Sequence, residues 1–258
     1  MKRASFHESR LLMGEAQVLR TVAHELRSPL TALVTSAELL AEDFDDLESS
    51  QKYEIVASMH RGALWMHTLV ENLLCDASIR EGRFHLNRKI VSLLDIVAEV
   101  QPVVAPLLKR RRQRLEFESS ILIPDVIADP RRIGQVLVNF LSNASKYSPD
   151  DSAIGISLTL KGSYARAEVS DRGPGIPKGD ETRLFESFYR TPAAHSSSEA
   201  GVGLGLSIVK TILEAHAGRC GAENRPDGGA SFWFELPTPA ALGTTGEEPE
   251  TEIGERRR

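Results

Sequence analysis

The chain has 258 residues, of which 41% are hydrophobic and 26% are charged, and its formal net charge at pH 7 is −5. Such a composition can bury a core and remain in solution, which excludes a collagen-like, low-complexity or fully disordered protein. The negative balance also argues against broad electrostatic binding to nucleic acid.

The first third of the chain predicts two long helices. Apolar residues recur at alternating spacings of four and three over residues 12–40, which is a heptad seam, and after an acidic break at 42–50 the seam resumes over 56–77. Two seams joined by a short turn predict an antiparallel helical hairpin. Because two helices cover each other on one side only, we expect a second copy to complete a four-helix bundle. Pro29 lies inside the first helix, where it predicts a kink rather than an end.

From about Arg83 the pattern alternates between helices and strands, which predicts a mixed α/β domain. Asp129 is the expected N-cap of its second helix, with Pro130 at the first helical position. After Pro237 the periodicity ends, so we expect residues 238–258 to form a disordered tail. The expected helices span 92–112, 129–146 and 204–216; strands are expected at 114–118, 124–128, 154–160 and 164–170, and two more end the domain at Leu236.

Targeting signals are absent from this sequence. No run approaches the about 20 apolar residues that a membrane span needs, and no apolar segment follows the basic N-terminus. Two cysteines, Cys75 and Cys220, are too few for a disulfide framework and fit a reducing compartment. We therefore expect a cytoplasmic chain with no membrane segment.

His24 lies at the edge of the first apolar seam, next to Glu25 and one turn before Ser28. A lone histidine in such a place is most often an ordinary surface residue. Its neighbours favour a second interpretation, because a neutral imidazole can attack an electrophilic phosphorus while an adjacent carboxylate takes its proton.

Asn139, Asn143 and Lys146 share one face of the predicted helix 129–146. Amide oxygens can bind a hard cation such as Mg²⁺, and a lysine can meet phosphate oxygens. Taken alone, these residues are equally compatible with a solvated polar stripe.

Two glycine-rich segments complete the set of motifs. The segment 171–177 follows a predicted strand and contains Asp171, a possible acceptor for an exocyclic amine. The segment 201–206 opens a predicted helix, whose free N–H groups favour phosphate. Neither segment has the glycine spacing of a Rossmann fingerprint or a P-loop, which disfavours those nucleotide sites.

In this order, the motifs resemble the catalytic core of a two-component sensor histidine kinase, over about residues 9–237. The resemblance covers the H-box at 24–30, the N-box at 139–149, the G1 box at 171–177, the F-box at 184–190 and the G2 box at 201–206, followed by the closing-strand segments 216–218 and 228–232.

The resemblance implies an α + α/β fold. Residues 9–80 would be the dimerisation and histidine phosphotransfer domain, a helical hairpin that forms a homodimeric four-helix bundle. Residues 83–237 would be a Bergerat-type ATP-binding domain, an α/β sandwich. The implied cofactors are ATP and Mg²⁺, and the implied partner is the receiver domain of a response regulator.

The resemblance also assigns roles to single residues. His24 would be the phosphoacceptor and Glu25 its general base, while Ser28 stands where the family carries a residue used in phosphatase activity. Asn143 would bind Mg²⁺ with help from Asn139, and Asp171 would read the adenine amino group. The other implied nucleotide-binding residues are Lys146, Tyr147, Gly173, Gly175, Ile176, Arg190, Gly201, Gly203, Leu204, Gly205 and Leu206. Val202 departs from the family's usual Thr or Ser, which removes one hydroxyl contact to phosphate.

Two other classes of protein stay open from the sequence. A different ATPase with the same nucleotide fold would keep the glycine motifs, but it would leave the hairpin and His24 without a role. A nucleotide-binding scaffold that acts mainly as a response-regulator phosphatase is the other class. The presence of Glu25, Asn143, Lys146 and Asp171 argues against a scaffold that has lost its kinase activity.

Overall fold

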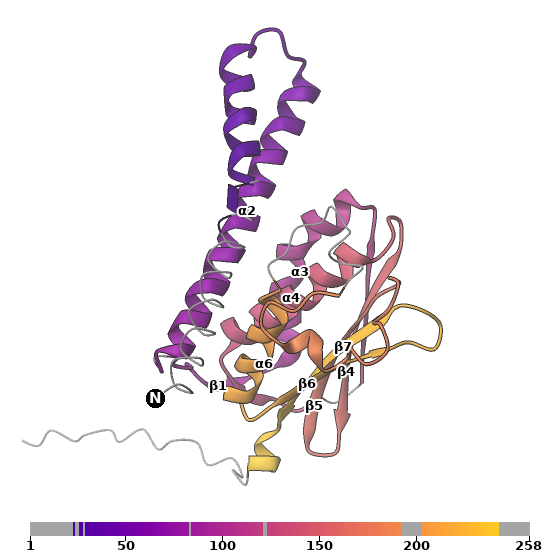
Figure 1. The fold of residues 1–258 in the computed structure, drawn as a ribbon. Coiled ribbons are helices and arrows are strands. Elements are labelled where there is room, and N and C mark those ends of the chain that lie inside the picture. The colour runs from indigo at the N-terminus through magenta and orange to yellow at the C-terminus, as the bar shows by residue number, and fades with distance from the viewer. Residues whose placement is uncertain are drawn as a thin grey trace, which may run out of the picture. The chain divides into compact units, whose positions relative to one another are not determined.

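The computed structural model describes residues 23, 26, 27, 29–82, 84–120, 123–191 and 203–242 (Figure 1). The chain divides into two compact units. The first contains the described residues up to 85 together with 183–208, and the second contains 86–182 together with the described residues from 209 onward.

The first unit contains the predicted helical hairpin. Residues 29–42 are helical, residues 43–48 form the turn, and α2 (Ser49–Arg80) follows. The backbone N–H of Glu48 donates to Gln51 Oε1 over 2.9 Å at the start of α2. A Cβ placed on Gly62 would lie 3.6 Å from Leu33 Cγ, so the two helices pack closely there. The hairpin is confirmed, whereas the kink at Pro29 stays a prediction because Glu25, four residues back, lies outside the described residues.

The apolar seam of the hairpin is only partly covered within one chain. Leu30 of the first seam is 53% exposed, and Val56 and Val70 of the second seam are 54% and 43% exposed. Within the described part of the chain, no helix is both long enough and apolar enough to cross a bilayer.

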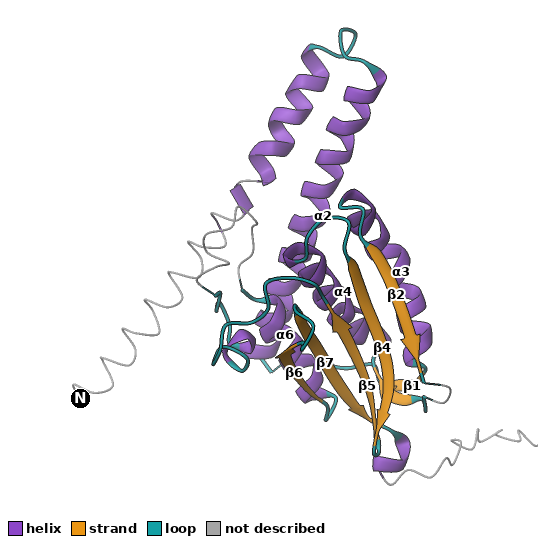
Figure 2. Cartoon of the chain, turned by 90° about the vertical axis from the view of Figure 1, so that its right-hand side faces the viewer, coloured by secondary structure: helices purple, strands orange, loops and turns teal. Residues whose placement is uncertain are grey.

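A five-stranded mixed sheet is the centre of the second unit (Figure 2). Its strand order is β2-β4-β5-β7-β6; β2 pairs with β4 in parallel, and the other neighbours are antiparallel. The strands are β2 (Arg114–Ser119), β4 (Ala153–Lys161), β5 (Tyr164–Ser170), β6 (Arg219–Asn224) and β7 (Ala230–Pro237). Buried and half-buried residues alternate along β5, as expected where only one face of a strand is covered by core.

Helices cover one face of this sheet (Figure 2). They are α3 (Leu93–Arg110), α4 (Pro130–Tyr147) and the part of α6 (Gly205–Ala215) that belongs to this unit. Phe140 of α4 is fully buried, and its ring centroid lies 5.7 Å from that of Phe232 and 6.4 Å from that of Phe234. These contacts fix α4 on β7, so the last turns of α4 have a defined place beside the sheet.

The start of α4 agrees with its sequence signals. Oδ1 of the N-cap Asp129 accepts hydrogen bonds from the backbone N–H groups of Arg131 and Arg132, and Pro130 occupies the first helical position. The predicted strand 124–128, which precedes α4, belongs to a two-stranded sheet whose other strand the sequence did not predict. Here β1 (Lys89–Val91) pairs antiparallel with β3 (Val126–Ala128).

The expected tail begins with ordered residues. The backbone N–H and the hydroxyl of Thr238 both donate to Ser163 O over 3.0 Å, and a 3-10 helix, Pro239–Leu242, follows. The disordered segment predicted for 238–258 therefore does not start at Thr238, because two long-range hydrogen bonds hold that residue on the β4–β5 turn.

The end of α6 carries backbone strain. The N–H of Gly218 donates to Leu213 O and the N–H of Ala217 donates to Glu214 O, which together form a Schellman motif. This motif requires a left-handed residue after the cap, and Ala217 has a φ of 54° there. Ala217 is exposed, so contacts of its methyl group do not offset the strain.

Ala217→Gly should stabilise the protein by about 0.5 to 1 kcal/mol, since glycine removes the left-handed strain but adds freedom to the unfolded chain. Ala215→Gly, two residues earlier and inside α6, should instead destabilise it by about 1 kcal/mol. Urea unfolding of both variants checks the prediction. A loss of stability in Ala217→Gly would contradict it.

Candidate functional site

The candidate site in the second unit is built around the carboxylate of Asp171, which directly follows β5. Asp171 is only 4% exposed. Its Oδ1 accepts two backbone hydrogen bonds, from Gly173 N at 2.7 Å and from Ala230 N at 3.1 Å. From the residues that the structure describes, no hydrogen bond reaches its Oδ2. One oxygen is therefore used to hold the fold, and the other is available as an acceptor.

Burial dominates the electrostatics of this group. Desolvation raises the pKa of Asp171, while the backbone N–H groups of Gly173 and Ala230 and the charge of Arg225 act in the opposite direction. When no ligand is bound, a buried carboxylate with one oxygen that accepts no hydrogen bond lowers the stability of the protein. Such a group is typical of a site where a donor arrives with a ligand.

The loop after Asp171 lies against the end of α4. A Cβ on Gly173 would be 2.8 Å from Tyr147 O, a distance that a side chain cannot occupy, so glycine is needed for this close approach. The loop is also held from the other side by Asn224. Ile176 N donates to Asn224 Oδ1 over 2.6 Å, and Asn224 Nδ2 donates to Ile176 O over 2.8 Å. The buried Ile176 and the adjacent Gly175 are thereby fixed in place.

The polar face of α4 supplies the remaining groups of this unit. Asn139 is 8% exposed and donates from Nδ2 to Gln135 O over 3.0 Å, which leaves its Oδ1 as an acceptor. Asn143 and Lys146 are half-buried, and Lys146 Nζ lies 5.0 Å from the ring centroid of Tyr147.

This donor set fits Mg²⁺. The cation prefers oxygen ligands and is commonly held by one or two protein groups together with phosphates of a substrate. The amides of Asn139 and Asn143 offer such oxygens, on one face of α4. Among the described residues there is no group of three or more histidine, cysteine or acidic side chains that would hold a different metal ion.

Six of the predicted nucleotide-binding residues lie in the segment 183–208 of the first unit, and five of them are among the described residues. The N–H of Phe188 donates to Gly203 O over 2.9 Å, and Gly203 has a φ of 76°. A Cβ on Gly203 would lie 2.8 Å from Tyr189 O, so only glycine allows this contact. This hydrogen bond holds residue 188 against residue 203. Leu204 is buried, whereas Arg190, Gly205 and Leu206 are half-buried.

The remaining predicted residues fall outside the described part of the chain. These are His24, Glu25, Ser28 and Gly201. Their roles stay predictions, as do the boundaries 9–80 and 83–237.

Sequence reasoning missed several residues of the site. Asn224 ends β6 and precedes a turn, so it resembled an ordinary turn residue. Ser148, which accepts a hydrogen bond from Arg172 N over 3.2 Å, is the C-cap of α4; it lies within the N-box segment 139–149 but was given no role. The N–H of Ala230 was also unexpected, because only the three-dimensional pairing of β5 with β7 brings it to Asp171.

Comparison with known protein families gives two matches. The His Kinase A (phospho-acceptor) domain matches residues 15–82, and the Histidine kinase-, DNA gyrase B-, and HSP90-like ATPase family matches residues 128–240. The chain carries the two domains of a histidine kinase catalytic core. The first match includes His24 and the hairpin, so an unrelated ATPase of the same nucleotide fold is not favoured.

Curated relatives agree with this histidine kinase core. The sensor protein KdpD of Clostridium acetobutylicum is 32% identical over 222 residues, which is 86% of this chain and 24% of that protein. The adaptive-response sensory kinase SasA of Synechococcus sp. (strain CC9311) is 33% identical over 228 residues, covering 88% of this chain and 57% of that protein. The chain therefore spans about a quarter of the length of the first relative and more than half of the second.

Solved structures agree as well. Full-length ShkA in complex with AMPPNP matches with a TM-score of 0.60 and 27% identity, covering 86% of this chain and 45% of that one. The histidine kinase ThkA in complex with the response regulator protein TrrA matches with a TM-score of 0.60 and 26% identity, covering 92% and 67%. The match to the ATPase family at residues 128–240 supports ATP binding by this chain.

The raised pKa of Asp171 predicts a pH-dependent penalty on stability. Above its ordinary pKa of 3.8, the folded state binds more protons than the unfolded chain until the folded pKa is passed. The free energy of unfolding thus falls as the pH rises through this window and stays lower above it. Asp171→Asn removes the penalty and keeps a carbonyl oxygen for Gly173 and Ala230.

Nucleotide-free Asp171→Asn should therefore be more stable than the parent protein at pH 7, and the difference should shrink as the pH falls towards 3.8. Urea unfolding at a series of pH values measures it. Asp125→Asn, at an exposed position, is the matched control and should change nothing. A lower stability of Asp171→Asn at pH 7 would refute the prediction.

Proposed function

We propose that this chain is an ATP-dependent protein histidine kinase, which phosphorylates its own His24 from Mg-ATP and passes the phosphoryl group to an aspartate of a response regulator. The observation that carries the proposal is the buried Asp171, with one carboxylate oxygen held by the backbone and the other unused. An exocyclic amine of adenine is a donor that matches this oxygen.

In this proposal, α4 and the glycine loop bind the nucleotide together. The base lies against Asp171 and the loop 173–176, and Asn139, Asn143 and Lys146 meet the phosphates from one helical face. Bound Mg²⁺ would neutralise phosphate charge beside the two amides. The segment containing Gly203, Gly205 and Leu206 contributes N–H groups at the start of α6.

The transfer itself is a displacement at phosphorus. A nitrogen of the His24 imidazole attacks the γ-phosphorus, a P–N bond forms, and the bond to the β–γ bridging oxygen breaks as ADP leaves. Glu25 accepts the proton that the other ring nitrogen loses as the P–N bond forms. Positioning and charge neutralisation supply most of the acceleration in such reactions.

The second transfer moves the phosphoryl group to a partner. A carboxylate oxygen of the response regulator attacks the phosphorus and the P–N bond breaks, which regenerates His24. Support comes from the related kinase ThkA, whose structure was solved in complex with a response regulator protein. Ser28, one turn after His24, is the residue that would assist a phosphatase reaction.

We also propose that the kinase is a homodimer. Leu30, Val56 and Val70 of the apolar seam remain between 43% and 54% exposed in a single hairpin. A second hairpin would bury this apolar seam as a four-helix bundle, which provides a reason for its length.

Incubation with γ-labelled ATP and Mg²⁺ should place label on the protein, and this label should be lost in acid and survive in base, as phosphohistidine is. His24→Gln should abolish the label. His60→Gln, which changes an exposed histidine of α2, is the matched control and should label normally. Asp171→Asn should label at least tenfold more slowly at limiting ATP, because a hydrogen bond to a charged group is lost. Label that persists in His24→Gln would overturn the assignment.

A further inference from the structure

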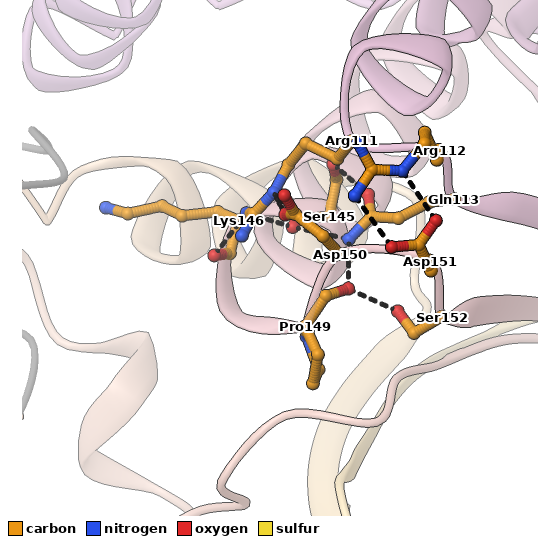
Figure 3. Close-up of polar contacts among 9 residues, drawn as sticks. All are labelled: Arg111, Arg112, Gln113, Ser145, Lys146, Pro149, Asp150, Asp151 and Ser152. Carbon is orange, nitrogen blue, oxygen red and sulfur yellow. Dashed lines mark hydrogen bonds and ion pairs between the residues drawn. The ribbon is translucent and has the colours of Figure 1, made fainter.

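The last turn of α4 is held by an interaction that the functional motifs do not include. Helices leave their last carbonyl groups without partners inside the helix. In α4, the carbonyl oxygen of Ser145 accepts from Arg111 Nη1 at 2.5 Å and from Gln113 Nε2 at 3.0 Å, and Lys146 O accepts from Arg111 Nη1 at 2.7 Å. Both donors lie in the turn between α3 and β2 (Figure 3).

The amide of Gln113 is fully engaged in this cluster. Its Oε1 accepts from Ser145 Oγ at 2.6 Å, and its Nε2 also donates to Pro149 O over 3.0 Å. Gln113 is 6% exposed and Ser145 is completely buried. Buried polar groups that are satisfied in this way are rigid, because every alternative arrangement leaves a donor or acceptor unpaired.

The backbone of the turn aims these side chains at α4. Gln113 N donates to Leu108 O and Arg112 N donates to Lys109 O, a Schellman motif that ends α3. Arg112 has the left-handed φ of 52° that the motif needs. The guanidinium of Arg111 is oriented further by Asp150, since Arg111 Nε donates to Asp150 Oδ1 over 2.8 Å.

We infer that Arg111 and Gln113 are positioning residues for the phosphates of the nucleotide, acting through Lys146. We call Arg111, Gln113 and Ser145 the α4 clamp. The inference rests on the proposed function, which places Lys146 against the phosphates. In Figure 3 the side chain of Lys146 extends away from the clamp, while its backbone carbonyl is held by it. The clamp fixes the backbone from which Lys146 projects.

Charge is a second reason for an arginine at this position. The C-terminal carbonyl groups of a helix carry the negative end of its dipole, which disfavours phosphates near the last turn. Arg111 binds two of these carbonyl oxygens and places a positive charge on them. The α4 terminus thereby becomes compatible with an anionic ligand beside Lys146.

The test is a double-mutant cycle on affinity for Mg-ATP, measured by calorimetry. Arg111→Met keeps the aliphatic stem and removes the donors, and it should weaken ATP binding about tenfold. In a Lys146→Met background the same change should have less than a twofold effect, because the residue through which it acts is gone. Binding of adenosine, which lacks phosphates, should stay within twofold in Arg111→Met.

Arg112→Met is the matched control. Arg112 adjoins Arg111 in the sequence and pairs with Asp151 on the surface, but it makes no hydrogen bond to α4 among the described contacts. It should leave ATP affinity unchanged. Gln113→Glu, which keeps an acceptor for Ser145 Oγ but loses the amide donor, should weaken ATP binding in the same direction as Arg111→Met.

Several results would overturn the inference. Arg111→Met could leave the ATP affinity unchanged, or could weaken the binding of ATP and of adenosine equally. Its effect on ATP affinity could also be as large in the Lys146→Met background as in the parent protein. Finally, Arg112→Met could weaken ATP binding as much as Arg111→Met does. Each leaves the proposed kinase function intact if the parent protein binds ATP and labels on His24. Failure of the parent protein to bind ATP would instead overturn the proposed function, and this inference with it.

Discussion

The burial of the Asp171 carboxylate is the constraint on which the candidate site depends. A carboxylate that is 4% exposed can stay inside a protein only if hydrogen bonds offset its lost hydration. Two backbone N–H groups do this at one oxygen, from Gly173 in the next loop and from Ala230 at the start of β7. The side chain that we propose reads the base therefore also joins two segments that are distant in the sequence.

The surroundings of Asp171 follow from this arrangement. Its loop can reach Ala230 and still pass α4 only because Gly173 has no side chain to meet Tyr147 O. Asn224 then fixes the far side of the loop through both backbone groups of Ile176. The hydrogen bonds that hold the carboxylate of Asp171 and those that hold the carbonyl groups of Ser145 and Lys146 involve different residues, so substitutions can test the proposed base and phosphate contacts separately.

Local signals predicted the elements well, and long-range contacts explain what was missed. The N-cap Asp129 and Pro130 predicted the start of α4, and the hydrophobic seam predicted the hairpin. The three-residue strand β1 is too short to show a period, and its pairing with β3 depends on tertiary structure. The expected helix 92–112 ends beside Arg111 and Gln113, and nothing local shows that these side chains meet the carbonyl groups of α4 more than 30 residues later.

The central claim is that Asp171 recognises the base of a bound nucleotide. A comparison of the protein's affinities for ATP and GTP tests this claim most directly. Guanine carries an oxygen where adenine carries an amino group, so a carboxylate at this place should repel it. Calorimetric titration of the parent protein should show ATP binding at least tenfold tighter than GTP, and Asp171→Asn should lose most of that preference. An ATP preference that is equally strong in Asp171→Asn would contradict the account.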